Sequence, residues 1–121
     1  MKTDNVILEK SFAFAIRIVN VYKYLINEKK EFVLSKQLLR SGTSIGANIE
    51  ESIGGFLEAG FVFKISISFK EARETVYWIK LLAATDYFTN EEAQSLIDDA
   101  EELCRIIGKI QITIKNNKHN S

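Results

Sequence analysis

No proline occurs among the 121 residues of this chain, and only six residues are glycine. Proline breaks the interior of a helix, whereas folds rich in turns and sheets usually contain it. The sequence therefore favours long, uninterrupted helices. The length is sufficient for a hydrophobic core without disulfides or metals, and we predict a single domain covering residues 1–121.

Apolar spacing and capping signals divide the chain into four helical segments. The predicted helices cover residues 4–28, 35–53, 57–85 and 90–115, and residues 116–121 are predicted to be a flexible tail. We expect Ser35 to cap the second helix, and Thr89 and Glu92 to form a capping box before the fourth. Long helices joined by short links predict an all-α fold, an antiparallel up-and-down four-helix bundle.

The start of the third predicted helix also fits a strand by its spacing. Residues 61–69, FVFKISISF, alternate between apolar and other residues, but helix-forming residues follow without a turn. A lone strand would leave its backbone groups unpaired, so we predict a helix. Two apolar sides then follow from the helical spacing: Phe61, Ile65, Ala72, Val76 and Ile79 on one side, and Phe63, Ile67, Trp78 and Leu82 on the other.

The first predicted helix is more apolar than a single buried side requires. Between Asn5 and Ile26, 15 of 22 residues are apolar, counting alanine and tyrosine. A helix that buries one side needs roughly three apolar positions in seven. The surplus predicts a second buried side, which in a chain of this length implies a partner subunit and a homo-oligomer.

The charge balance bears on possible partners. Sixteen basic residues balance sixteen acidic ones, whereas dedicated nucleic-acid binders usually carry a basic excess. We therefore do not favour nucleic acid, although a local patch could exist. The basic residues considered for such contacts are Lys10, Arg17, Lys23, Lys36 and Arg40.

The expected location of the chain is the cytoplasm. Its single cysteine, Cys104, cannot form an intramolecular disulfide, and no secretory signal is visible at the start. The most apolar segment, residues 12–26, contains charged residues and is too short to span a bilayer, so no membrane partner is expected.

Residues 40–52, RSGTSIGANIEES, contain many small polar side chains and could suggest a chemical site. A phosphate loop would need four residues between its glycines and a following lysine, which this stretch lacks. A serine nucleophile would need a base, and the sole histidine is His119 in the predicted tail. The neighbouring glutamates have no histidine at the spacing of a bundle metal site. We therefore expect no enzymatic activity, no metal and no cofactor.

The same stretch fits a role in helix packing. Small residues four apart allow a second helix to approach closely, and hydroxyl or amide groups can bond across the contact. The predicted packing motif consists of Ser41, Gly42, Ser44, Gly46 and Asn48, which we expect on one stripe.

Two segments, SKQLLRSGTSIGANIEES and FKISISFKEARETVYWIKLL, resemble the bacterial four-helix bundle proteins related to the rRNA intervening-sequence proteins. The resemblance extends from Asn5 to about Ile114. The positions that match the family's motif are Gln37, Arg40, Ser41, Ser44, Ile45, Asn48, Glu51, Lys64, Glu71, Glu74 and Trp78.

The resemblance implies an up-and-down bundle that assembles as a ring, commonly a homopentamer, without known enzymatic activity. The family is similar to the accessory variability determinant of diversity-generating retroelements. Those relatives bind nucleic acid and a reverse transcriptase through a basic surface, whereas this chain is neutral overall. We therefore predict a non-enzymatic homo-oligomer that acts in assembly or interaction, with a nucleic-acid-binding accessory factor as the alternative.

Overall fold

The computed structural model describes residues 2–54 and 58–120, and within these ranges the chain forms four α-helices and no strand. The helices are α1 (Lys2–Asn27), α2 (Leu34–Ile53), α3 (Glu58–Ala84) and α4 (Asn90–Asn120). The predicted all-α bundle is therefore confirmed, including a helix where residues 61–69 also fitted a strand. The predicted start of the third helix, residue 57, lies outside the described residues.

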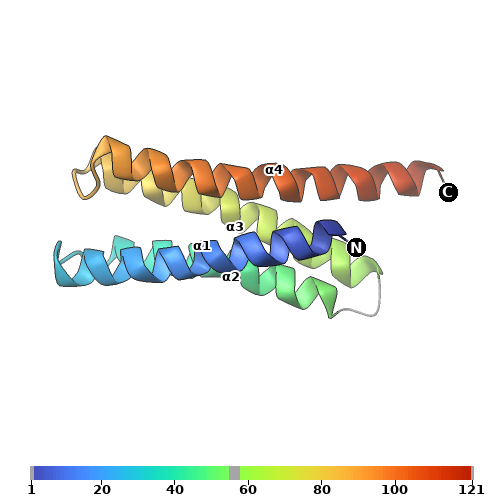
Figure 1. Cartoon of the computed structure of the whole chain (residues 1–121), viewed down its shortest axis with the longest axis horizontal. Helices are drawn as coiled ribbons and strands as arrows, with labels where there is room; N and C mark the ends of the chain where they lie inside the picture. Colours follow the sequence, from blue (N-terminus) through green and yellow to red (C-terminus); the bar gives the residue numbers. More distant parts are fainter. Residues whose placement is uncertain (1, 55–57, 121) are drawn as a thin grey trace.

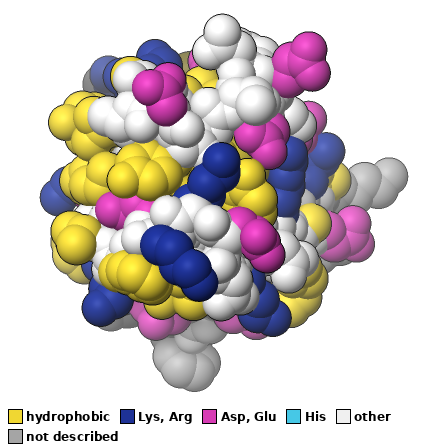
Figure 2. Space-filling model, turned by 90° about the vertical axis from the view of Figure 1, so that its left-hand side faces the viewer, with side chains coloured by type: hydrophobic (Ala, Val, Ile, Leu, Met, Phe, Trp, Pro, Cys, Tyr) yellow, Lys and Arg dark blue, Asp and Glu magenta, His cyan; other side chains and the backbone are white. Residues whose placement is uncertain are grey.

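The helices alternate in direction, so α1 and α3 run one way and α2 and α4 the other (Figure 1). Each helix packs against the next along the chain, while α1 and α4 close the bundle through a much looser contact. Figure 2 looks onto the end that carries connections 28–33 and 85–89, where charged side chains of both signs are interspersed with hydrophobic ones.

The core follows the helical spacing of the apolar residues. Leu96, Ala100, Leu103, Ile107 and Ile110 of α4 are buried in a continuous seam, as steps of three and four residues require. The other helices contribute Ile7, Phe14, Ile18, Leu25, Leu38, Ile45, Ile49, Ile65, Ala72, Ile79 and Leu82. None of the helices over the described residues is both long enough and apolar enough to cross a bilayer.

The start of α2 differs from the prediction. The helix begins at Leu34, and the Val33 position before it makes no side-chain capping bond, so Ser35 is not the cap. The Glu31 carboxylate instead accepts hydrogen bonds from the backbone N–H groups of Val33 at 3.1 Å and Ser35 at 2.7 Å. The Ser35 hydroxyl donates back to the Glu31 carbonyl at 2.7 Å.

The predictions for the two ends of α4 had different outcomes. The predicted capping box is present, because Thr89 N–H donates to Glu92 Oε1 at 2.8 Å and Glu92 N–H donates to Thr89 Oγ1 at 3.1 Å. At the other end, α4 continues past the predicted residue 115 to Asn120, and so includes most of the predicted tail. No glycine or proline follows Gly108 to end the helix.

Candidate functional site

The outer side of α1 carries apolar side chains that the bundle leaves uncovered. Phe12 is 68% exposed and Ile16 is 51% exposed, whereas Phe14 and Ile18 are buried in the core. Residues four apart share one side of a helix, so Phe12 and Ile16 form a single stripe. A single copy of the chain therefore leaves part of α1's apolar surface in water.

An open groove of about 410 Å³ lies beside this stripe, between α1 and α2. Leu8, Phe12 and Ala15 line it from α1, while Thr43 and Ala47 line it from α2. The groove is mainly apolar, with Glu50 at its edge. We call the stripe and the groove together the α1–α2 face, formed by Leu8, Phe12, Ala15, Ile16, Thr43 and Ala47.

Beneath this face α1 and α2 are in close contact at two glycines, of which Gly46 lines the groove. A Cβ added at Gly42 would lie 2.8 Å from side-chain carbons of Ile18. A Cβ at Gly46 would lie 3.2 Å from the Ser11 carbonyl oxygen. Both glycines therefore face α1, where larger side chains would push the helices apart.

Ser41, another residue of the predicted packing motif, faces α3 instead. Thr75 Oγ1 donates to Ser41 Oγ across the contact at 3.0 Å, and Ser68 Oγ donates to the Ile45 carbonyl at 2.9 Å. Asn48 Nδ2 donates within α2, to the carbonyl of Ser44 at 2.8 Å and to its hydroxyl at 3.1 Å. The five residues thus lie on two sides of α2 rather than on the single stripe expected.

A charged cluster joins α2 and α3 on the outside of the same contact. The Arg40 guanidinium pairs with Glu71 at 3.3 Å and also with Glu74. Trp78 Nε1 donates to Glu74 Oε2 at 2.9 Å, so the indole is held by the same cluster. Charge-assisted hydrogen bonds of this kind fix side-chain orientation as well as helix register.

The remaining polar residues of the family motif lie farther along the same side. Lys64 pairs with Glu51 at 2.7 Å, again linking α3 to α2. Gln37 is exposed near the start of α2. The structure therefore brings most of the motif together as links between two neighbouring helices.

The side of α3 next to this cluster is apolar and partly uncovered. Phe63 is 63% exposed and Tyr77 is 58% exposed, while Ile67, Trp78 and Leu81 are half-buried. The Tyr77 and Trp78 rings meet edge to face, 5.1 Å apart. We call these five residues the α3 face. Leu82, predicted on this side, is instead fully buried in the core.

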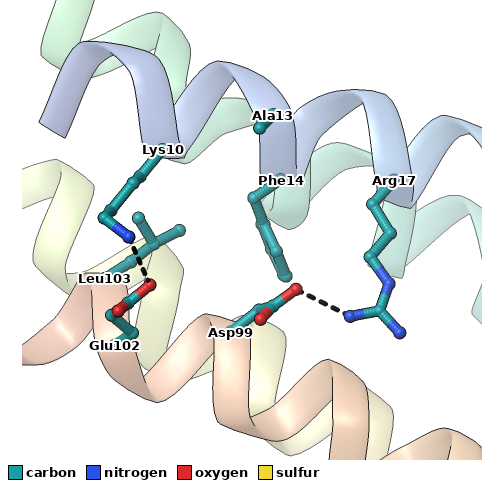
Figure 3. Close-up of a pocket in the computed structure, with 7 residues that line it drawn as sticks. All are labelled: Lys10, Ala13, Phe14, Arg17, Asp99, Glu102 and Leu103. Carbon is teal, nitrogen blue, oxygen red and sulfur yellow. Dashed lines mark hydrogen bonds and ion pairs between the residues drawn. The ribbon is translucent and has the colours of Figure 1, made fainter. Parts of the chain in front are cut away.

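Two of the basic residues considered for nucleic acid are paired across the loose contact between α1 and α4. Lys10 binds Glu102 at 3.2 Å, and Arg17 binds Asp99 at 2.6 Å. Arg17 also donates to the carbonyl and the hydroxyl of Ser95. Figure 3 shows both pairs bridging a cavity of about 340 Å³.

The other three basic candidates lie elsewhere. Lys23 and Lys36 are exposed near the end of the bundle that carries the 28–33 connection, and Arg40 is engaged by two carboxylates. The α1–α4 and α2–α3 contacts lie on opposite sides of the bundle. The five residues therefore do not form one patch of free positive charge.

The described residues carry little reactive chemistry. Burial raises the pKa of the half-buried Cys104 thiol, although nearby Arg73 and Arg105 act in the opposite direction. Among the side chains that the structure describes, in residues 6–54 and 59–117, no three His, Cys, Asp or Glu come together as a metal site requires. The side chain of His119 lies outside the described residues.

Sequence reasoning missed two members of the α3 face. Tyr77 and Leu81 were not among the residues expected on the second side of α3, yet both contribute to its uncovered apolar surface. The signal that could have revealed them is their spacing of four residues, which continues the stripe begun by Phe63 and Ile67.

Comparison with known proteins gives a consistent picture. The model of the family described as 23S rRNA-intervening sequence protein matches residues 3–109. A crystal structure from Bacteroides thetaiotaomicron, described as a protein of unknown function from the S23 ribosomal protein family, is similar at 51% identity with a TM-score of 0.89. The match covers 90% of this chain and 97% of that one. No curated protein matches, and neither description points to catalysis.

Proposed function

The chain belongs to the 23S rRNA-intervening sequence protein family, and we propose that it acts as a homo-oligomeric four-helix bundle with a role in assembly or interaction. The protein is non-enzymatic in this proposal and works in the cytoplasm. For the arrangement we propose a ring of five copies, which the resemblance of its motifs to ring-forming bundles implies.

The uncovered apolar stripe on α1 carries this proposal. Phe12 and Ile16 are both more than half exposed, although their neighbours along the helix fill the core. Covering a large apolar side chain stabilises a protein by roughly 1.5–3 kcal/mol compared with leaving it in water. A stripe of this kind beside an apolar groove is typical of a surface that a protein partner covers.

The test is the mass of the protein in solution across a wide range of concentrations. Light scattering coupled to size exclusion should give a multiple of the 13.8 kDa chain mass. The double substitution Phe12→Asp and Ile16→Asp should reduce the mass, because two carboxylates would have to lose water in the contact. A wild-type protein that stays a single copy at high micromolar concentration would contradict the proposal.

Nucleic-acid binding is the alternative function, and the dependence of RNA binding on salt concentration distinguishes it from assembly alone. Lys10, Arg17 and Arg40 already have acidic partners, so few of the candidate cations are free to contact phosphates. Retention on RNA that falls steeply with rising ionic strength would support the alternative. Absence of retention at low salt would remove it.

A further inference from the structure

We propose that copies of the chain meet through two different faces, with the α1–α2 face of one copy packed on the α3 face of the next. This inference rests on the proposed homo-oligomer and specifies its interface. When two copies join through two different faces, the pair keeps one free face of each kind, so addition continues until a ring closes.

The positions of the two faces around the bundle support this pairing. On α1, Phe12 and Ile16 lie away from α4, because Lys10 and Arg17 on a different side of the helix reach α4. On α3, the uncovered residues lie next to Glu74, which reaches Arg40 of α2. The two faces are therefore adjacent sides of the bundle that share α2.

This position sets the symmetry of the assembly. Adjacent sides of a four-helix bundle meet at about 90°, because its helices pack nearly parallel at the corners of a square. If the two contact planes of one copy meet at about that angle, each copy fills about a quarter to a fifth of a full turn. The ring then closes with about four or five copies. In such a ring α2 points toward the central axis and α4 lies at the outer rim.

The two faces also have complementary shapes. The α1–α2 face contains a groove of about 410 Å³ whose floor is thin because Gly46 lies there. The α3 face instead presents an uncovered ridge, in which the exposed Phe63 and the half-buried Ile67 are the residues nearest the groove. Two copies of the groove could not fill each other, whereas an aromatic ridge fills a groove well.

The two faces also lie at matching heights, that is, at similar positions along the long axis of the bundle. Gly46 lies against Ser11 of α1, and the carbonyl of the adjacent Ile45 accepts a bond from Ser68 of α3, so Ser11 and Ser68 lie at similar heights. A rotation about an axis along the bundle preserves height. Phe12 of one copy therefore lies within about 3 Å of Ile67 of the next in position along the bundle, a difference of two residues in a helix.

The same register brings opposite charges and further apolar groups together. Glu9 precedes the exposed stripe on α1, and Lys70 lies between Ile67 and Glu74 on α3, within about one helical turn of the height of Glu9. Phe63 lies within about 3 Å, along the bundle, of the end of the groove that Leu8 lines. Opposite charges around an apolar contact favour this pairing of faces over one that juxtaposes identical faces.

Two single substitutions test the pairing, one on each face. Phe12→Asp alters the α1–α2 face, and Phe63→Asp alters the α3 face; both side chains are more than half exposed, so each variant should fold. Circular dichroism checks the folding. Ile112→Asp is the matched control, since Ile112 is 60% exposed on α4, which lies away from both faces.

At concentrations at which the wild type and the Ile112→Asp control are oligomers, we expect each face variant to be a single copy. Each substitution should weaken the affinity of the altered contact by about 30-fold or more. An equimolar mixture of the two face variants should form a dimer of twice the chain mass, because one intact junction remains between an unaltered α3 face and an unaltered α1–α2 face.

Other outcomes are equally informative. If Phe63→Asp assembles as the wild type does, or if the mixture stays a single copy, the pairing of faces is wrong while the homo-oligomer stands. If the wild type itself is a single copy, the proposed function fails together with this inference.

Discussion

At Gly42 the backbone of α2 lies so close to the Ile18 side chain of α1 that even a methyl group lacks room. A Cβ there would lie 2.8 Å from two carbons of Ile18, a side chain with no exposed surface. Isoleucine is branched at Cβ and stiff, so it cannot turn away easily. The contact of Gly42 with Ile18 therefore sets how closely the two helices pack.

Replacing this glycine should destabilise the protein although alanine is the better helix former. We expect Gly42→Ala to lower the free energy of unfolding by about 1–3 kcal/mol, the usual cost of overpacking. Gly60→Ala is the control, because nothing lies within 4 Å of a Cβ at Gly60 in α3. That change should stabilise by about 0.4–1 kcal/mol. Urea unfolding at one protein concentration measures both, and equal effects would contradict the close contact.

Cys104 provides a prediction with a defined pH dependence. Burial raises its thiol pKa above the ordinary value of 9.0, so the neutral thiol is favoured in the folded protein. The folded protein should react slowly with thiol reagents near pH 8 and rapidly once denatured. The stability from this shift is present below the unfolded pKa and is lost as pH rises through the folded pKa.

The comparison with Cys104→Ala isolates that contribution. The wild type should lose stability relative to this variant as the pH rises above 9.0, the ordinary thiol value. A constant difference in unfolding free energy between pH 7 and pH 10 would show that the thiol titrates normally.

The small residues of α2 show what the sequence reveals at this scale. Their spacing identified a helix that others can approach closely, but not which neighbour each residue meets. Gly42 faces α1 and Ser41 faces α3, although they are adjacent in the sequence. A helix turns by about 100° per residue, so neighbours in sequence face different helices once both sides of α2 are occupied.

Among the elements, α2 depends on a residue that lies outside it. The Glu31 carboxylate accepts bonds from Val33 and Ser35 at the first turn, where a helix has unpaired N–H groups. The preceding Lys30 has a φ of 55°. This turn in the chain lets the Glu31 side chain reach forward to the start of α2. This arrangement escaped the sequence analysis because Ser35 has the standard side chain for a cap, whereas Glu31 reaches the helix end only through the turn.

Removal of this carboxylate should loosen the start of α2. We expect Glu31→Ala to cost about 1–2 kcal/mol, because two backbone donors lose their partner. Glu28→Ala, at an exposed position in the same connection, should change stability by less than about 0.5 kcal/mol. Hydrogen exchange at the first turn of α2 should accelerate in the Glu31 variant alone. Unchanged protection there would show that another group caps the helix.

For the whole molecule, sequence patterns predicted the architecture well because each long helix must bury a regularly spaced stripe. The capping box before α4 was predicted directly from the spacing of Thr89 and Glu92. The surplus of apolar residues on α1 was also visible in the sequence, and the structure shows that Phe12 and Ile16 of this surplus lie on the surface. In the proposed assembly the α3 face covers this stripe, and α1 and α3 are far apart in sequence. Apolar spacing within one helix therefore could not predict the pairing of these two surfaces.

If copies cover each other's apolar faces, the stability of the fold must depend on protein concentration. Association that binds only the folded state raises the midpoint of thermal unfolding as the concentration increases. We expect this rise for the wild type, and a constant midpoint for Phe12→Asp, whose side chain is 68% exposed in a single copy and contributes little to the core. Scanning calorimetry over a hundredfold range of concentration measures both. Equal midpoints for the two proteins at every concentration would mean that Phe12 stays in water in the native state.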